Sequence, residues 1–143
     1  PFWRIVADVT GRLFRLQGVA APMQVQRRAK ELMGEREVVA RSTRYILRAF
    51  VDWGVVCDSA GKGEYQAAAP GVVSDPRLAA WLFETVVVSS ADGRTDFQSL
   101  VNSPCLFPFQ ICRIVPAQLS ETGRLEVVRH SLEETLVRVA SGR

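Results

Sequence analysis

Residues 43–56 read TRYILRAFVDWGVV, and they form the end of a longer segment, Glu37–Trp53, that has the spacing of a two-faced helix. One face holds apolar or neutral residues at positions i, i+4, i+7, i+8 and i+11, namely Val39, Thr43, Ile46, Leu47 and Phe50. The opposite face holds the polar and cationic residues Arg41, Ser42, Arg44, Tyr45 and Arg48. The pattern predicts a helix that buries the first face, exposes the second and ends at Gly54.

Two further helices are predicted upstream. Phe2–Gln17 has apolar residues three and four positions apart, and its expected inward stripe is Phe2, Ile5, Val6, Val9, Leu13 and Leu16. The second helix, Pro22–Met33, begins with a proline, which a first helical turn tolerates, and Gly34 follows it. Its expected inward stripe is Met23, Val25, Ala29, Leu32 and Met33.

Short strands are predicted around these helices. Val19–Ala21, between the first two helices, is suited to one short strand. After Gly54, Val55–Cys57 and Glu64–Ala67 predict two strands joined by the turn-rich segment 58–63. Residues 2–69 therefore predict helix, strand, helix, helix, strand, loop and strand, in that order.

This order of elements resembles the winged-helix branch of the helix-turn-helix superfamily. Residues 43–56 are similar to the end of a recognition helix in that family, where an aromatic-glycine pair, here Trp53-Gly54, leads directly into the first strand of the wing. One departure from the family pattern is that seven residues, Glu35–Arg41, separate Gly34 from Ser42. Either the third helix begins a turn early, or the turn is looser than usual.

The resemblance implies that residues 1–70 form a winged helix-turn-helix unit whose recognition helix, about residues 36–53, enters the major groove of double-stranded DNA. Independently of the resemblance, a recognition helix must seat one face on its neighbours and present the other to the groove, and Glu37–Trp53 has both faces. The expected nucleic-acid-binding residues are Arg27, Arg28, Lys30, Arg41, Ser42, Arg44, Tyr45, Arg48 and Lys62.

These residue types suit different parts of DNA. Arg44 and Arg48 are suited to guanine edges or phosphates, and Tyr45 to a sugar or a thymine methyl group. Ser42 is expected to contact a phosphate, and the cations of the second helix are expected at the flanking backbone. Lys62, at the tip of the predicted wing, is placed to reach an adjacent phosphate or the minor groove.

Positive charge is concentrated in the first half of the chain. Residues 1–66 contain eleven Arg or Lys and seven Asp or Glu, a net charge of +4, whereas residues 67–143 contain seven and eight, a net charge of −1. Arginine, which binds phosphate and guanine in a bidentate manner, predominates among the cations, although a biased genome would give the same excess. Glu35, Glu37 and Asp58 lie close to the expected surface and weaken its positive field.

Residues 71–143 predict a helical and β-hairpin half, so the expected fold class is α+β. Ser74 or Asp75 is expected to cap a helix beginning at Pro76. Its expected inward face is Leu78, Leu82 and Val86, widened by Trp81 and Phe83. This nearly neutral half either packs on the first unit to complete one core, or forms a homodimer or partner surface.

The later elements of this half are short. The sequence predicts a helix over Phe97–Val101 capped by Thr95 or Asp96, a strand over Phe107–Ile114, a loop over Pro116–Gly123 and a strand over Leu125–Arg129. The carboxyl end is ambiguous. Ser131–Glu134 fits a helix capping box, whereas Thr135–Val139 alternates like a strand.

Several classes of protein do not fit the sequence. No stretch approaches the roughly 18 to 20 apolar residues of a membrane span, so no membrane partner is expected. Cys57, Cys105 and Cys112 are odd in number and lack a C-x-x-C spacing, which indicates a cytoplasmic protein without a metal site or other cofactor. The sequence offers only one combination for nucleophilic catalysis, with His130 as general base and Cys105 or Cys112 as nucleophile. Nothing but the residue types supports it, so no enzyme is expected. Trp3, Trp53 and Trp81 are expected in the core.

The leading hypothesis is a DNA-binding protein of bacterial style that acts as a transcriptional regulator or another DNA-associated factor. The alternative is a protein–protein interaction module of a larger assembly that is built on a winged-helix fold. Because the sequence begins at Pro1 rather than at methionine, we expect it to be a processed or excised piece.

Overall fold

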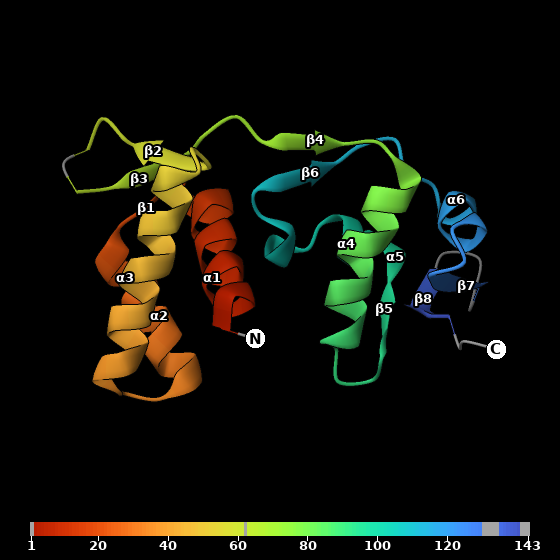
Figure 1. The fold of residues 1–143 in the computed structure, drawn as a ribbon, viewed down its shortest axis with the longest axis horizontal. Coiled ribbons are helices and arrows are strands. Elements are labelled where there is room, and N and C mark those ends of the chain that lie inside the picture. The colour runs from red at the N-terminus through yellow and green to blue at the C-terminus, as the bar shows by residue number, and fades with distance from the viewer. Residues whose placement is uncertain (1, 62, 130–134, 141–143) are drawn as a thin grey trace. The chain divides into compact units, whose positions relative to one another are not determined.

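The computed structural model describes residues 2–61, 63–129 and 135–140, and its fold is a mixture of α-helices and small β-sheets (Figure 1). The chain divides into two compact units. The first unit comprises Pro1–Gly71 with Pro104–Pro108, and the second comprises Val72–Ser103 with Phe109–Arg143. Because residues 67–71 and 104–108 contain no charged side chain, the sequence charge of the first unit is +4 and that of the second is −1.

The helices of the first unit follow the predicted order. The three predicted helices are α1 (Phe2–Gln17), α2 (Pro22–Met33) and α3 (Glu37–Asp52), and the unit also contains the 3-10 helix η1 (Pro104–Leu106), which was not predicted. Three residues, 34–36, connect α2 to α3, so the third helix begins early and the turn is short. The recognition-helix candidate therefore spans almost the whole predicted segment 36–53.

The strands of the first unit form one small antiparallel sheet. Strand β1 (Val19–Ala20) pairs with β3 (Tyr65–Ala67), and β3 pairs with β2 (Val56–Asp58), which gives the order β1-β3-β2. Gly54 connects α3 to β2 with a φ of 68°, in the left-handed region that a side chain disfavours. The predicted strands are confirmed, and Lys62, between β2 and β3, lies outside the described residues.

The core of the first unit joins its three long helices and its sheet. The expected stripe of α3 is confirmed, because Val39, Thr43, Ile46, Leu47 and Phe50 are all buried. Phe50 contacts Phe107, with ring centroids 5.7 Å apart. In contrast, the expected stripes of α1 and α2 are wrong in part, since Leu16, Met23, Leu32 and Met33 are exposed.

Helix η1 packs against α1, and Gly11 permits the close approach. A Cβ atom on Gly11 would lie 2.6 Å from the carbonyl oxygen of Pro104, so an alanine does not fit without movement of backbone. The predicted division at residue 70 omitted this return of the chain, because residues 104–108 carry no composition signal that separates them from their neighbours.

The second unit consists of short elements around one long helix. Its helices are α4 (Pro76–Val88), α5 (Phe97–Val101) and α6 (Pro116–Glu121). Its sheets are the pair β4 (Gly71–Val73) and β6 (Phe109–Ile111), and the antiparallel order β5-β8-β7, formed by β5 (Arg94–Asp96), β8 (Thr135–Val139) and β7 (Leu125–Arg129). Helix α4 packs against β8, β5 and α6.

The inward face of α4 differs from the prediction. The buried residues are Ala79, Ala80, Leu82, Phe83 and Val87, whereas Leu78 and Trp81 are exposed and Val86 is half-buried. Asp75 is the N-cap, and its Oδ1 accepts a hydrogen bond of 2.8 Å from the Leu78 N–H. The expected cap is therefore confirmed, while the phase of the helix is shifted.

Three other expectations for the second unit need correction. The predicted loop over Pro116–Gly123 contains α6, and residues 94–96 form the strand β5, which was not expected. The strand expected over Phe107–Ile114 is limited to β6. Thr135–Val139 is a strand, as one of the two open alternatives predicted, and residues 130–134, with His130, lie outside the described residues.

Candidate nucleic-acid interface

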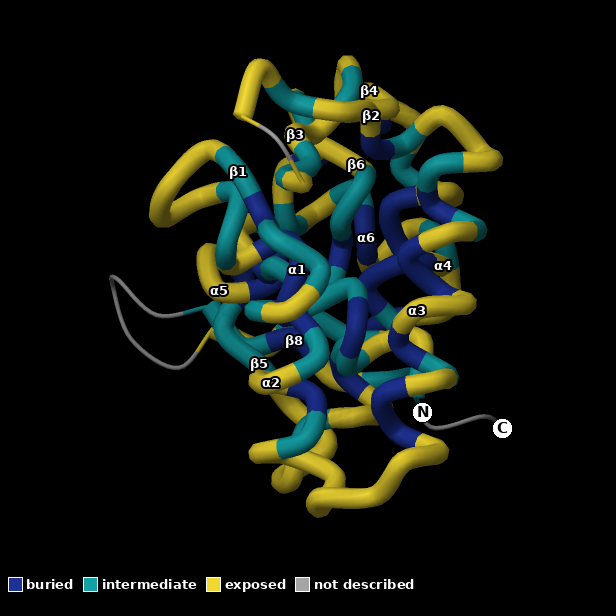
Figure 2. Tube along the Cα trace, turned by 90° about the vertical axis from the view of Figure 1, so that its left-hand side faces the viewer, coloured by how far each residue is buried: buried dark blue, intermediate teal, exposed yellow. Residues whose placement is uncertain are grey.

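Helix α3 positions most of the expected nucleic-acid-binding residues. Its buried stripe fixes the helix on the core, so the opposite side is turned to solvent (Figure 2). On that side Arg41, Arg44, Tyr45 and Arg48 are exposed, and Tyr45 retains 69% of its accessible surface. Ser42 is half-buried at the border of the two faces. Residues three and four positions apart on a helix are neighbours, so the four exposed side chains form one surface.

Two of these arginines are already bound to carboxylates of the same helix. Arg44 Nη2 lies 3.8 Å from Glu37 Oε1, and Arg48 Nε lies 3.2 Å from Asp52 Oδ1. Both pairs are exposed, and an exposed pair of this kind contributes only about 0.2–1 kcal/mol. A phosphate offers the same guanidinium a bidentate, doubly hydrogen-bonded partner, so it can displace the carboxylate at small cost.

The cations expected on α2 have the same arrangement. Glu31 accepts a hydrogen bond of 2.8 Å from Arg28 Nη1 and lies 3.8 Å from Arg27 Nε. Lys30 is half-buried on the same helix. Among the described residues, Lys30, Arg36 and Arg41 have no ion-pair partner, and all three lie near the junction of α2 and α3. These three cations lie close to the amino end of α3, where the unpaired carboxylate of Glu35 offsets part of their charge.

Sequence reasoning identified Glu37 as a weakening charge and missed Glu31 and Asp52. The sequence contains a signal for both ion pairs. Arg27 and Glu31 are four positions apart, as are Arg48 and Asp52, and side chains with this spacing are neighbours on a helix. Glu35, which was also expected to weaken the field, forms no ion pair with any described residue.

Sequence reasoning also placed Trp3 and Trp53 wrongly. Trp53 was expected in the core, but it is 65% exposed and stacks on Trp3, which is also exposed, with ring centroids 5.3 Å apart and planes 15° apart. Trp53 follows the last turn of α3, where its indole stacks on Trp3 of α1 and lies near Phe50, with ring centroids 6.4 Å apart. The pair therefore closes one end of the aromatic cluster and leaves an apolar surface in solvent.

The first unit has a groove between α1 and α2. Its volume is about 430 Å³, and its lining includes Leu13, Leu16 and Leu32. Two ion pairs border it, Asp8–Arg12 at 2.8 Å and Arg28–Glu31. Leu16 is 84% exposed, although the sequence predicted it to face inward.

Cys105 contacts two side chains of α1. Cys105 donates a hydrogen bond of 3.3 Å to Asp8 Oδ1, and Arg4 Nη1 lies 3.7 Å from its sulfur. These contacts tie η1 to α1. His130, the expected base, lies outside the described residues.

None of the helices in residues 2–61, 63–129 and 135–140 is both long enough and apolar enough to cross a membrane.

No protein-family model matches this chain, and no curated protein sequence matches it. The winged-helix resemblance of residues 2–69 therefore stays a prediction that depends on the residues and the geometry described above.

Proposed function

We propose that the first unit is a winged helix-turn-helix that binds double-stranded DNA by inserting α3 into the major groove. The observation that carries the proposal is the division of α3 into a fully buried stripe and an exposed surface formed by Arg41, Arg44, Tyr45 and Arg48. A helix seated by one face and cationic on the other is what major-groove recognition requires.

The arrangement of the other elements supports a winged helix. A short strand between α1 and α2 pairs with the hairpin that follows α3, so the hairpin is joined to the three-helix core. The turn between α2 and α3 is three residues long, which favours the tight turn usual in the superfamily over the looser alternative. The hairpin of β2 and β3, with its loop at 59–64, is the candidate wing.

The chemistry of the interface would be an exchange of ionic partners. Arg41 and Arg36 would meet the DNA first, because they have no carboxylate partner among the described residues and lie at the positive end of the α3 dipole. Arg44 and Arg48 would then exchange Glu37 and Asp52 for phosphates or guanine edges. Tyr45, between them, would contact a sugar or a thymine methyl group.

The wider proposal is a cytoplasmic transcriptional regulator or other DNA-associated factor that acts as a homodimer through its second unit. The absence of a disulfide among Cys57, Cys105 and Cys112 is compatible with a reducing compartment. A twofold dimer would present two copies of α3 to two half-sites.

The test is binding of a labelled random-sequence duplex at low salt, measured by fluorescence anisotropy. The double variant Arg44→Ala/Arg48→Ala is expected to weaken binding at least about tenfold and to reduce the salt slope by about two, because two phosphate contacts are lost. The matched control is Arg113→Ala/Arg129→Ala, which removes the same charge from exposed positions of the second unit. Equal affinity of wild type and the α3 variant would refute the proposal.

A second pair of substitutions tests the exchange of ionic partners. Glu37→Gln/Asp52→Asn keeps the shape of both side chains and releases Arg44 and Arg48. We expect tighter DNA binding and a steeper salt dependence, since two repelling charges are removed from the surface. Weaker binding would show that the carboxylates do not compete with the DNA.

The alternative function is a protein-interaction module on the same fold. It is favoured by the carboxylate partners of the arginines and by the exposed leucines of the α1–α2 groove. Under this alternative the chain does not shift duplex DNA even at low salt, and it associates with a protein in a manner that salt does not weaken. Leu16→Glu/Leu32→Glu would abolish that association, whereas Arg44→Ala/Arg48→Ala would leave it intact.

A further inference from the structure

The outer side of α3 has a line of uncharged side chains beside its arginines. Val38, Ser42, Tyr45 and Ala49 recur at positions i, i+4, i+7 and i+11, and this spacing places them along one edge of the helix. We call these four residues the neutral line. Val38 is 60% exposed and Tyr45 is 69% exposed, whereas Ser42 and Ala49 are half-buried. Solvent therefore reaches the neutral line mainly at Val38 and Tyr45.

The charged side chains of α3 form a second line next to it. Arg41, Arg44 and Arg48 are at positions i, i+3 and i+7, so they are neighbours along the helix. The only carboxylates of α3 are those of Glu37 and Asp52, and each is paired with an arginine of this second line. A partner lying along the outer side thus meets guanidinium groups on one line and an isopropyl group and a phenol ring on the other.

The major groove of DNA presents matching groups. Phosphates and the N7 and O6 atoms of guanine accept hydrogen bonds from guanidinium groups. Thymine places its C5 methyl group in the same groove, where apolar side chains contact it. Because 5-methylcytosine presents the same methyl group, the shared chemistry is a pyrimidine with a methyl group at C5.

The two exposed members of the neutral line reach different base pairs. A rise of 1.5 Å per residue places Val38 and Tyr45 about 10.5 Å apart along α3. Successive base pairs are only about 3.4 Å apart along the duplex. One methyl group cannot contact both side chains, so each has a methyl contact of its own.

We propose that α3 recognises the C5 methyl groups of pyrimidines in the major groove through Val38 and Tyr45. This inference rests on the proposed function and gives it a sequence preference. It adds Val38 to the residues of the interface, as a residue that determines specificity and leaves phosphate binding to the arginines. The signal for Val38 was its spacing of seven positions from Tyr45, which sets both on the same edge of the helix.

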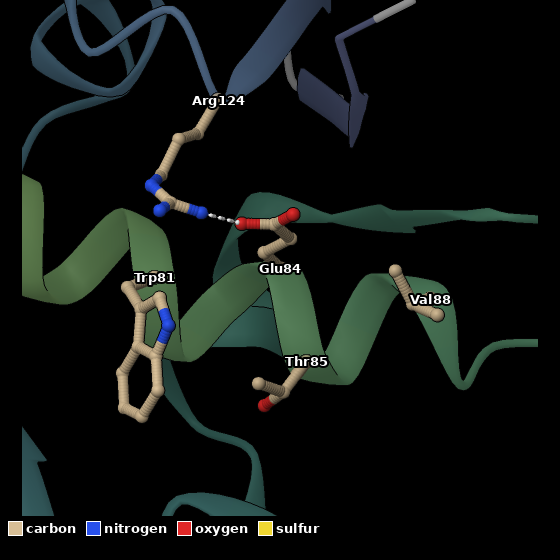
Figure 3. A pocket seen from close by; sticks show the side chains of 5 residues that line it. All are labelled: Trp81, Glu84, Thr85, Val88 and Arg124. Carbon is tan, nitrogen blue, oxygen red and sulfur yellow. Dashed lines mark hydrogen bonds and ion pairs between the residues drawn. The ribbon is translucent and has the colours of Figure 1, made fainter.

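Helix α4 offers a matched control, because it has an exposed valine in another setting. Val88 is 68% exposed and lines a hollow of about 390 Å³ with Trp81, Glu84, Thr85 and Arg124 (Figure 3). The two charges of this hollow balance each other, since Glu84 accepts a hydrogen bond from Arg124. Val88→Ser therefore removes the same side chain from a helix surface without an adjacent line of arginines.

The test compares three pools of duplex DNA by fluorescence anisotropy with the full chain. A random-sequence pool is enriched for binding to wild type and then copied with thymidine, with deoxyuridine, or with deoxyuridine and 5-methyldeoxycytidine. Deoxyuridine pairs like thymidine but lacks the methyl group. Wild type is expected to bind the thymidine pool at least about fourfold more tightly than the deoxyuridine pool, as burial of one methyl group predicts.

The variants separate methyl recognition from phosphate binding. Val38→Ser/Tyr45→Ser should bind the thymidine and deoxyuridine pools with nearly equal affinity, because the apolar contacts are lost. Val88→Ser should keep the wild-type ratio of affinities. Arg44→Ala/Arg48→Ala should weaken binding to both pools and also keep the ratio. Circular dichroism should show an unchanged fold for the first variant, since both side chains are exposed.

The outcomes distinguish this inference from the proposed function. Equal binding of the thymidine and deoxyuridine pools by wild type would overturn the inference and leave the proposed function standing. A preference for thymidine that Val38→Ser/Tyr45→Ser retains in full would do the same. A wild-type chain that enriches no duplex and binds none of the pools would refute the proposed function itself.

The third pool identifies the source of the methyl group. Once wild type prefers thymidine, recovery of affinity with 5-methyldeoxycytidine would show that methylated cytosine is recognised as well. No recovery would assign the contact to thymine alone. Either result supports recognition of a C5 methyl group.

Discussion

Helices α3 and α4 are the central helices of their units, and both bury a continuous apolar stripe. Their outer sides differ in chemistry, because α3 exposes guanidinium groups while α4 exposes an indole and aliphatic side chains. The net charges of the two units, +4 and −1, follow the same division. The core faces of the two helices are alike in chemistry, so it is the outer faces that distinguish them, and the proposed function rests on the cationic outer face of α3.

The largest expected effect tests whether the two cores are independent. Phe50→Ala removes a buried ring beneath α3, and Phe83→Ala removes one beneath α4. Each should lower the free energy of unfolding by about 3–5 kcal/mol, since a cavity is left in a packed core. Hydrogen exchange should show the loss of protection mainly in the unit that carries the substitution. Equal loss in both units from either variant would show that they unfold as one.

The next effect concerns the packing of η1 on α1 in the first unit. Gly11→Ala should destabilise this unit by about 1–3 kcal/mol, because the new methyl group would press on the Pro104 carbonyl. Denaturant unfolding monitored by the fluorescence of Trp3 and Trp53 would measure it. Helix propensity alone favours alanine by about 1 kcal/mol, so a gain in stability would show that η1 does not pack closely there.

Substitutions at the N-caps of α4 and α3 should change the free energy of unfolding in opposite directions. Asp75→Ala removes the side-chain cap of α4 and should cost about 1 kcal/mol of unfolding free energy. At α3, the N-cap is Arg36, whose side chain makes no capping hydrogen bond, so Arg36→Ser should gain up to about 1 kcal/mol. Thermal unfolding of the two variants would check both signs. The same change at Arg36 should weaken DNA binding, because it removes a cation at the amino end of α3.

The smallest effect lies in the sheet that packs against α4. A hydrogen bond from Arg138, with the attraction of its positive charge, lowers the pKa of Glu126 below its usual value. The pair therefore stabilises the fold above the unfolded-state pKa of the carboxyl, and this contribution is lost as the pH falls through the lowered pKa. Glu126→Gln should slightly reduce the loss of stability that occurs as the pH falls below about 5. The measurement is the free energy of unfolding in urea at several pH values. The same dependence on pH in wild type and variant would contradict this.

The first unit was predictable because its boundaries carry strong local signals. Gly18, Pro22, Gly34 and Gly54 mark where helices begin or end, and the observed bounds differ from the predicted ones by a residue or two. The phase of α3 was also predictable, since Arg41, Arg44 and Arg48 can only lie on the solvent side. The candidate site on α3 follows from the same pattern. The ion pair of Arg48 with Asp52, four positions away, was predictable from the spacing, whereas that of Arg44 with Glu37, seven positions away, was located by the structure.

The second unit was less predictable because its signals are weaker. Helix α4 is apolar nearly all round, and in it only Arg77 and Glu84 are charged, so the periodicity does not fix which stripe faces the core. Strand β5 has three residues, including Arg94 and Asp96, and pairs with β8 more than thirty positions further along the chain. Local propensity contains no information about a pairing of that range.

The return of residues 104–108 to the first unit means that no single cut separates the two units. A fragment ending at Gly71 would lack Leu106 and Phe107, and its α1 would present the bare backbone of Gly11 to water. The complementary fragment, residues 72–143, would contain Leu106 and Phe107 but would lack α1, against which η1 packs. To study the first unit alone, the pentapeptide Pro104–Pro108 would have to be joined to residues 1–71 through a linker.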